Sequence, residues 1–474
     1  MKGGISTKAN ESPALPEDFT ARMKERLGER YPGWEASFAE ASPVSVRLNP
    51  AKWSGDLPAD RVPWCNTGYY LAERPLFTAD PWFHGGAYYV QEAASMFLEQ
   101  AFRSVNLPGQ ALVLDLCGAP GGKSTHLLSL LRRGDLLVAN EVIRSRALVL
   151  RENISKWGNP HVVVTQNDPR DFASLPPLFD LVVADAPCSG EGLFRKERAA
   201  IAEWSQNNAA LCAARQKRIL ADAWSCLKPG GTLIYSTCTF NPAENEENVE
   251  WLVSQTEAIP VEVPLLPEWN IETIHPGNGV AGYQFSPDRI RGEGFFMAVI
   301  RKPGDSPGAP RSRLALRNRE LASKTTAAAL DKWILPESEV AFLRRENEMD
   351  IFPAGWLRTL GDLEKHLRIV QSGTCLASMA GEQFIPHPDL AHSLVFNPSA
   401  FPVRTVDLNE AVAFLRKENL SAETTGKGWM LVSYRGIPLG WLKNLGTRTN
   451  NYYPSERRIR MNINNIPLPW HERS

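Results

Sequence analysis

The stretch LDLCGAPGGKSTHLL, residues 114–128, decides the fold of this chain. It consists of an apolar run that ends at Asp115, a glycine-rich turn, and a helical pattern that begins near Lys123. A strand, a glycine-rich turn and a helix in this order form the ligand-binding unit of open α/β sheets. The glycines let a ligand approach the backbone, and the amides that open the helix favour an anionic group.

Apolar runs of strand length surround this turn and alternate with longer helical runs. They cover residues 111–117, 135–142, 161–168, 179–187, 232–238 and 295–301. Alternation of this kind predicts an α/β, Rossmann-like domain over residues 105–302, with a parallel sheet covered by helices. Because parallel strands require crossover connections, their carboxyl ends open on one edge of the sheet, where ligands bind.

Two further regions flank this domain. Residues 1–104 open with a charged helical stretch and continue through an aromatic run punctuated by Pro and Gly, which predicts an α+β module. Residues 303–325 read as a linker because they are rich in Pro, Gly, Ser and Arg. In the remaining region, 326–474, the run WMLVSYRGIPLGWLKN predicts two strands around an Arg-Gly turn. We therefore expect a small β-rich module over about 400–474.

The bulk composition points to a globular protein without membrane spans. Of the 474 residues, 43% are hydrophobic and 22% charged, and no run approaches the ~18 apolar residues of a membrane helix. The first residues lack the apolar stretch of a secretory signal, so we expect a cytoplasmic location. The seven cysteines include no CxxC pair, which favours reduced thiols over disulfides or a metal site. A net charge of −1 neither favours nor excludes a nucleic-acid partner.

The glycine turn does not fit the common nucleotide-binding patterns. Cys117 stands where a P-loop has its first glycine, and the run contains no GxGxxG. A ligand with an amino-acid end and a nucleoside end explains more, because the loop and helix amides can hold its carboxylate. S-adenosylmethionine is such a ligand.

Two acids at the ends of later strands suit the nucleoside end of this ligand. Glu141 is placed to accept hydrogen bonds from the ribose hydroxyls, and Asp168 from the adenine amino group. Each acid alone also fits a helix N-cap or a solvated strand end. Their register with the glycine turn favours the ligand-binding interpretation.

Two cysteines follow the next strands, Cys188 in DAPCSG and Cys238 in STCT. Carbon 5 of cytosine is a poor nucleophile, so a methyl acceptor there must be activated by adding a soft anion to carbon 6. A thiolate suits that addition because it attacks well and leaves well. Asp185, which ends the fourth strand, is the candidate acid for ring nitrogen N3. We expect the other five cysteines to be buried apolar groups or, for Cys117, part of the glycine turn.

Other functions compete with this interpretation. Zinc-dependent cytosine deamination needs a cysteine three residues after the one in Pro187-Cys188, and none is there. An amino-group methyltransferase on the same fold would carry a D/N-P-P-Y strand end in place of Asp185-Ala-Pro-Cys188. A non-catalytic RNA-binding assembly factor that keeps the fold as a scaffold remains a further alternative.

Three motifs in order, DLCGAPGGKST, DAPCSGEGLFRK and STCTFNPAENE, resemble the Sun-type RNA cytosine-C5 methyltransferases. The resemblance covers about residues 40–302. The stretch GIPLGWLKN…YYP is similar to the PUA-like RNA-binding module of the bacterial branch called methyltransferase F, which modifies 16S ribosomal RNA. The resemblance implies a class I S-adenosylmethionine-dependent methyltransferase domain. One departure lies at Gln284 and Asp288, where relatives commonly carry arginine and histidine, and suggests that an RNA contact is lost there.

The resemblance also implies roles for individual residues. Cys238 attacks carbon 6, Cys188 assists product release, Asp185 serves the reacting base and the donor, and Lys196 lies near the target nucleotide. The residues implied to contact the methyl donor are Cys117, Gly118, Ala119, Pro120, Gly121, Gly122, Lys123, Glu141, Asp168 and Asp185. The implied partner is 16S ribosomal RNA of the small subunit, near the decoding region. We expect a cytoplasmic monomer that needs no metal and binds no membrane.

Overall fold

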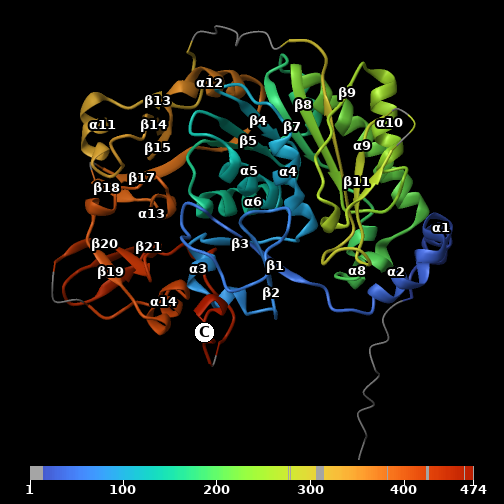
Figure 1. Cartoon of the computed structure of the whole chain (residues 1–474). Helices are drawn as coiled ribbons and strands as arrows, with labels where there is room; N and C mark the ends of the chain where they lie inside the picture. The colour runs from blue at the N-terminus through green and yellow to red at the C-terminus, as the bar shows by residue number, and fades with distance from the viewer. Residues whose placement is uncertain are drawn as a thin grey trace, which may run out of the picture.

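A ten-stranded sheet forms the centre of the computed structural model, and five of its strands are parallel (Figure 1). In spatial order these are β8 (Leu227–Thr237), β7 (Phe179–Asp185), β4 (Leu112–Asp115), β5 (Leu136–Asn140) and β6 (Val162–Thr165). The chain runs outward from β4 through β5 to β6 and then returns to the other side of β4. The strand order therefore reverses between β4 and β7, the point at which open α/β sheets bind ligands.

Antiparallel strands extend both edges of this parallel core. On the β8 side lie β12 (Phe295–Arg301), β11 (Gly282–Phe285) and β10 (Glu272–Ile274), and β9 (Ile259–Pro260) also pairs with β12. On the β6 side lies β16 (Ile369–Ser372). All six strands predicted for residues 105–302 are present, and the predicted α/β class is confirmed.

Helices cover both faces of the sheet. One face carries α4 (Leu98–Arg103), α5 (Gly122–Leu130) and α6 (Arg144–Trp157). The other face carries α9 (Gln206–Cys226), α10 (Glu246–Gln255) and α12 (Leu357–His366). The short helices α7 (Pro169–Phe172) and α8 (Arg198–Glu203) and the 3₁₀ turns η4 (Glu191–Leu193) and η5 (Pro267–Trp269) lie in the connections. The apolar sheet residues are buried on both faces, as the continuous apolar runs of parallel strands require.

The N-terminal module is an α+β unit, as predicted. Its three-stranded sheet has the order β2-β1-β3, and its Arg47 reaches the glycine-rich turn. Its elements are α1 (Glu17–Leu27), η1 (Gly28–Arg30), α2 (Tyr31–Ser37), β1 (Val44–Leu48), β2 (Gly68–Leu71), η2 (Phe77–Ala79), α3 (Pro81–His84), β3 (Tyr88–Val90) and η3 (Ala94–Phe97).

The region after residue 313 contains two more sheets. The first has the order β13-β14-β15-β17-β18, and the second has the order β19-β20-β21-β22. The elements of the first are β13 (Glu320–Leu321), α11 (Lys324–Asp331), β14 (Val340–Arg345), β15 (Glu348–Pro353), η6 (Ala354–Trp356), β17 (Thr374–Ala380), β18 (Gln383–Pro386) and α13 (Pro388–His392). Between β15 and β17 the chain contributes α12 and β16 to the central sheet, so this region shares its core with the methyltransferase-like domain.

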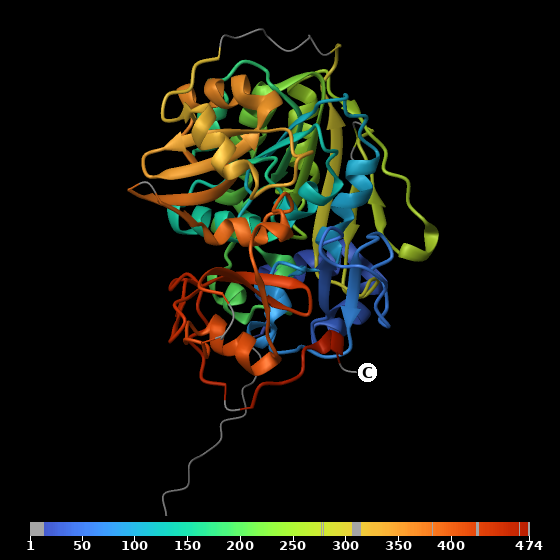
Figure 2. The same ribbon diagram turned by 90° about the vertical axis from the view of Figure 1, so that its left-hand side faces the viewer.

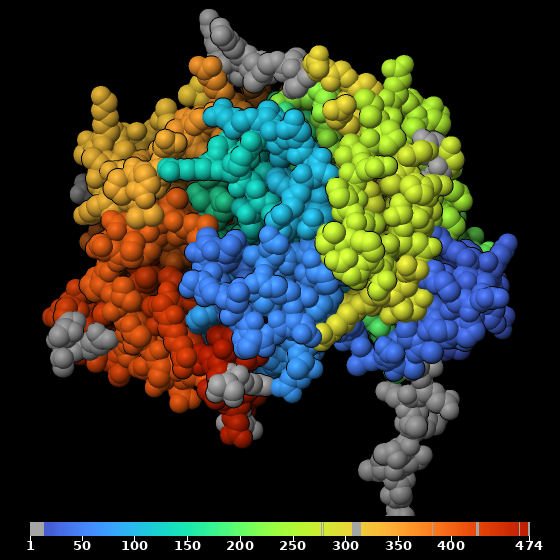
Figure 3. All heavy atoms as spheres, viewed as in Figure 1, coloured from blue at the N-terminus to red at the C-terminus, as the bar shows by residue number. Residues whose placement is uncertain are grey.

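The last sheet confirms the β-rich C-terminal module. Its elements are η7 (Pro398–Ala400), β19 (Val403–Thr405), α14 (Leu408–Leu415), β20 (Gly428–Tyr434), β21 (Ile437–Asn444), β22 (Thr449–Asn451) and η8 (Trp470–Glu472). The predicted turn lies at Arg435-Gly436, where both φ angles are positive, at 45° and 85°. Figures 2 and 3 show this module, in orange-red, beside the blue N-terminal module, and the Tyr453 hydroxyl contacts His84 Nδ1 at 3.3 Å.

The structure describes residues 14–275, 277, 279–305, 314–381, 383–422, 426–463 and 465–472. Residues 306–313 of the predicted linker therefore lie outside the described residues. Within the described ranges, no helix has the length and apolarity needed to cross a membrane.

We predict that a side chain at position 158 does not fit the junction between α6 and the C-terminal region and destabilises the fold. Gly158 has φ +91°, and a Cβ there would lie 2.1 Å from the His392 carbonyl oxygen. The Leu394 amide also donates to the Gly158 carbonyl at 2.9 Å. We expect Gly158→Ala to lower the free energy of unfolding by about 3 kcal/mol, measured by thermal or urea unfolding.

Gly55→Ala is the matched control, because Gly55 has a similar φ of +93° with nothing within 4 Å of a built Cβ. We expect it to cost only the backbone strain, about 1 kcal/mol. Equal losses in the two variants would contradict the packing argument.

Candidate active site

The glycine-rich turn follows β4 and is held from both sides. Gly121 adopts φ +118° directly before α5, and a Cβ on Gly118 would lie 2.8 Å from Ser124 Oγ. The Gly118 amide donates to the Asn140 carbonyl at 2.7 Å, which ties the turn to the end of β5. The turn therefore exposes backbone and helix-start amides at the sheet edge, as an anionic ligand requires.

Asp115 is a buried acid beneath this turn that the sequence interpretation did not single out. Its Oδ2 accepts from Ser124 Oγ at 2.6 Å, and its Oδ1 is buried without a hydrogen-bond partner among the described residues. Burial raises its pKa to about 7. An unsatisfied buried oxygen aimed at the turn is a candidate acceptor for a ligand amino group. Its position at the end of β4 was the available sequence signal.

The two acids expected at the nucleoside end lie where the sequence placed them, and each also caps local backbone. Glu141 is buried, accepts from the Ile143 amide at 2.9 Å, and lies 3.4 Å from Arg146. Asp168 is the N-cap of α7 and accepts from the Arg170 amide at 3.1 Å. The N-cap alternative thus describes Asp168, which nevertheless lines the same cavity as Glu141.

Asp185 ends β7 and forms an ion pair with the buried lysine of the glycine turn. The Lys123 Nζ lies 2.8 Å from Asp185 Oδ2, and Ser236 Oγ donates to Asp185 Oδ1 at 2.7 Å. The Lys123 ammonium also lies over the Phe295 ring, 4.9 Å from its centroid. The resemblance implies that Lys123 contacts the donor with the rest of the turn, whereas in the structure its ammonium group pairs with Asp185.

The two cysteines meet at the same sheet edge. Their sulfurs are 3.0 Å apart, and the Cys238 amide donates to the Cys188 sulfur at 3.3 Å. The hydrogen bond with Cys238, together with burial, raises the pKa of the Cys188 thiol well above its usual range. Cys188 therefore stays protonated at neutral pH.

A buried carboxylate, Glu244, links the two cysteine loops. It accepts from the amide and hydroxyl of Ser189, the residue after Cys188, at 2.8 and 2.5 Å. The Ser189 hydroxyl in turn lies 2.9 Å from Thr239 Oγ1, on the residue after Cys238. Sequence reasoning missed Glu244, although it stands in the quoted motif STCTFNPAENE.

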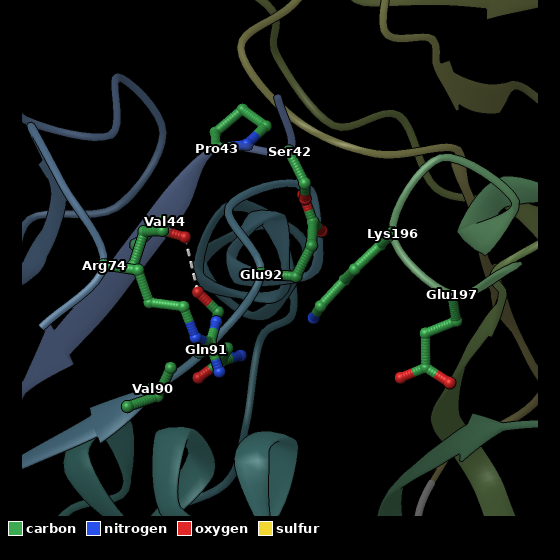
Figure 4. A pocket seen from close by; sticks show the side chains of 10 residues that line it. Ser42, Pro43, Val44, Arg74, Val90, Gln91, Glu92, Lys196 and Glu197 are labelled. Carbon is green, nitrogen blue, oxygen red and sulfur yellow. Dashed lines mark hydrogen bonds between the residues drawn. The ribbon is translucent and has the colours of Figure 1, made fainter. Parts of the chain in front are cut away.

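Several of these residues line one cavity of about 630 Å³. Its lining includes Cys117, Ala119, Glu141, Val142, Ile143, Asp168, Asp185, Cys188 and Cys238. Lys196 does not line it but lines a neighbouring cavity, shown in Figure 4. Of the remaining cysteines, Cys65, Cys212, Cys226 and Cys375 are buried, as expected.

The two positions that depart from the Sun-type pattern serve the fold. Gln284 is buried, and its amide donates to the carbonyls of Phe285 and Phe295 at 3.1 and 2.9 Å. Asp288 accepts from Arg30 of the N-terminal module at 3.0 Å.

Comparison with known proteins follows the same three-part division. Residues 104–301 match the family described as 16S rRNA methyltransferase RsmB/F. Residues 15–93 match the N-terminal domain of 16S rRNA methyltransferase RsmF, and residues 402–459 match the methyltransferase RsmF PUA domain. The chain is 32% identical to ribosomal RNA small subunit methyltransferase F of Cronobacter sakazakii, over 94% of this chain and 96% of that one.

The chain belongs to the ribosomal RNA small subunit methyltransferase F family. The Klebsiella pneumoniae member is 33% identical over 83% of this chain and 84% of its own. Among solved structures, NSun6 from Pyrococcus horikoshii with SFG has a TM-score of 0.52 and 21% identity, covers 62% of this chain and 99% of its own, and shows the shared fold.

Family members are S-adenosylmethionine-dependent, and the site of this chain fits that donor. The buried Glu141 lines the cavity and supplies an acceptor there, while Asp115, with one unsatisfied oxygen, and the amides that open α5 lie at the glycine-rich turn beside it. Val142 and Ile143 are 47% and 49% exposed on the same cavity, which offers an apolar surface for a flat ring.

We predict that Asp115 makes stability pH-dependent when no donor is bound. Its folded pKa of about 7 lies above the ordinary value of about 3.9, so the folded state binds the extra proton between these values. Stability therefore falls as pH rises from about 4 to about 7. We expect Asp115→Asn to flatten this dependence and to raise the melting temperature at pH 8 by roughly 2–5 °C.

Asp60→Asn is the control, since the Asp60 carboxylate is 81% exposed. An Asp115→Asn variant whose melting temperature follows the wild-type pH profile would contradict the assignment.

We predict that Glu244 sets the position of the cysteine loops. Glu244→Gln replaces a carboxylate that accepts two hydrogen bonds from Ser189 with an amide that accepts through one oxygen only. The loops that carry the two sulfurs are then no longer held in position relative to each other. We expect kcat for RNA methylation to fall by about 100-fold with little change in donor affinity. Glu99→Gln, at another buried carboxylate, is the control and should leave kcat within a few fold. Equal kcat losses in both variants would argue against a specific role.

Proposed function

We propose that this chain transfers a methyl group from S-adenosylmethionine to carbon 5 of a cytosine in 16S ribosomal RNA. One observation carries the proposal: two cysteines whose sulfurs are 3.0 Å apart, together with Asp185, which is paired with Lys123, line the cavity that borders the glycine-rich turn. Direct transfer to an amine needs neither sulfur. The family relationship supports the same reaction and substrate class.

The nucleophile in this proposal is Cys238. A hydrogen bond with Cys238 and burial raise the pKa of Cys188, which disfavours Cys188 as the attacking thiolate. The Cys238 thiolate adds to carbon 6, which makes carbon 5 electron-rich. Carbon 5 takes the methyl group, with S-adenosylhomocysteine as the other product. A base then removes the carbon-5 proton, the electrons of that bond re-form the carbon 5–carbon 6 double bond, and the carbon 6–sulfur bond breaks, which restores the Cys238 thiolate. Cys188, in contact with that sulfur, assists this elimination.

Asp185 stabilises the reacting ring. Lys123 and Ser236 fix its carboxylate through contacts of 2.8 and 2.7 Å, so the acid cannot turn away from the cavity. Addition to carbon 6 builds negative charge on the ring, and a proton donated from the Asp185 carboxyl group to N3 of the cytosine offsets that charge. The Lys123 ammonium, 2.8 Å from Asp185, can return the proton to the carboxyl group. The pair also explains why a lysine ends the glycine-rich turn.

The donor supplies an activated methyl group and is held by this chain's own groups. We assign its amino-acid end to Asp115 and to the turn from Cys117 to Lys123, its ribose to Glu141 and its adenine to Asp168. The buried Glu141 already accepts one backbone amide, which fixes the orientation of its carboxylate for a ligand.

The RNA partner is the small-subunit ribosomal RNA, near the decoding region, and the protein acts as a cytoplasmic monomer without a metal. The PUA-like module and the N-terminal module supply RNA-binding surface beside the catalytic domain. No step above requires a Lewis acid, since a thiolate and a proton donor at N3 supply the activation. Methylation of 16S RNA, assayed with and without a chelator, tests the RNA substrate and the absence of a metal. The mass of the protein in solution tests the monomer.

We predict that alanine variants of the two cysteines have different phenotypes. Cys238→Ala should lower methylation of 16S RNA by at least about 1,000-fold, because addition to carbon 6 is lost. Cys188→Ala should trap a covalent RNA–protein complex, because addition proceeds while elimination stalls. The complex would migrate as a retarded band on a denaturing gel.

Cys212→Ala, at a buried cysteine of α9, is the control and should retain activity. Full-rate methylation by Cys238→Ala would establish direct transfer instead. Binding of 16S RNA without any 5-methylcytosine product would favour the non-catalytic assembly factor.

A further inference from the structure

A second cavity, of about 440 Å³, lies where the N-terminal module meets the loop after Cys188 (Figure 4). Arg74, Gln91 and Glu92 line it from the N-terminal module and its connection to α4, and Lys196 lines it from the opposite side. In Figure 4 the Lys196 ammonium points toward Gln91 and Glu92. Two cations from separate parts of the chain thus face one space.

Neither cation is neutralised by the protein. Among the described residues, the side chains of Lys196 and Arg74 form no hydrogen bond or ion pair, and Arg74 makes only a contact with the Phe77 ring at 5.7 Å. The nearby Glu92 carboxylate is occupied by the backbone amides of Glu293 and Ser95, at 2.9 and 3.0 Å. Glu197 also lines the cavity, but among the described residues its carboxylate pairs with neither cation. The two cations therefore keep their hydrogen-bond donors for an anionic ligand.

The cavity is one short segment away from the reacting sulfurs. Gly190 and Leu193 line the cysteine cavity, and Lys196, whose amide donates to the Leu193 carbonyl at 2.9 Å, lines this one. The neighbouring Arg195 is buried against Glu293, with contacts of 3.1–3.2 Å, which anchors the segment. Lys196 therefore projects from a fixed base.

The other wall connects to the glycine-rich turn. Arg47 donates to Gln91 Oε1 at 2.8 Å and to Thr125 Oγ1 of α5 at 2.6 Å. The same guanidinium reaches the Gly122 carbonyl at 3.3 Å. Both walls of the cavity are thus tied to elements that form the donor and cysteine site.

We propose that this cavity binds the backbone phosphate of the RNA nucleotide adjacent to the target cytosine, with Lys196 and Arg74 as its two cationic contacts. The inference rests on the proposed function, since it takes the cytosine to lie at Cys238. A phosphate accepts from both cations at once, whereas a base offers no charge to either. Contact from both modules would also fix the N-terminal module over the bound strand.

An adjoining cavity offers the RNA strand a path away from the cysteines. A cavity of about 620 Å³ shares Ser42, Val44 and Arg74 with this one and adds Arg289 and Arg291 to its lining. Arg291 lies over the Tyr70 ring at 4.4 Å and pairs with Asp60 at 2.9 Å. Arg289 donates to the Asn270 carbonyl at 2.9 Å. The RNA backbone then runs from the cysteine cavity past Lys196 and Arg74 toward Arg289.

The test is the salt dependence of RNA binding by the full chain. Transcribed 16S ribosomal RNA is the probe, and its affinity for wild type, Lys196→Ala, Arg74→Ala and the double variant is measured over a range of salt concentrations. Because both cations contact the same phosphate, the double variant should lower the slope of log affinity against log salt by about 0.7, and each single variant by less than that. Donor affinity, measured by calorimetry, should not change, because neither residue lines the donor cavity.

Matched variants make the result specific. Arg133→Ala removes an exposed cation that lines neither cavity and should leave the slope unchanged. Lys196→Arg and Arg74→Lys keep the charge and should restore the slope. A wild-type slope in the double variant overturns the phosphate site even if methylation proceeds. A reduced slope without any 5-methylcytosine product retains the phosphate site and rejects the proposed reaction.

Discussion

The parallel pairing of β7 with β8 is the constraint on which the site depends. It places Asp185 opposite Ser236, so that the loops after both strands leave the sheet at the same edge and in contact. Cys188 and Cys238 are fifty residues apart in sequence, yet their sulfurs are 3.0 Å apart because of this register. A slip of one residue would turn every side chain of a strand to the other face and separate the two sulfurs.

Buried polar groups then adjust the chemistry of this edge. Lys123 holds Asp185, and Glu244 holds the residues that follow each cysteine. Such groups are costly to bury unless they are paired, and here nearly every one has a specified partner. Asp115 is the exception, with one oxygen unsatisfied at the turn. The arrangement keeps most of the site fixed before ligands bind and leaves one buried acceptor at the glycine-rich turn unsatisfied.

The surrounding modules are built into the same body. Strand β16 extends the central sheet, and α12 adds to the core on one of its faces. The PUA-like sheet shares an apolar core with the middle sheet and contacts the N-terminal module through Ile437. These modules are therefore held at set distances from the cysteines. In the proposed function, contacts that they make remote from the cytosine contribute to its placement.

The sequence by itself determined the strand–turn–helix unit, the alternation that makes the sheet, and the residues at its carboxyl edge. These features are local, because apolar period, glycine turns and strand ends are written in consecutive residues. Only the tertiary structure decided that β16 joins the central sheet, that Lys123 pairs with Asp185, that Glu244 bridges the cysteine loops, and that Lys196 and Arg74 face one cavity. Each of these unites residues far apart in the chain, and such pairings depend on how whole elements pack rather than on any local pattern.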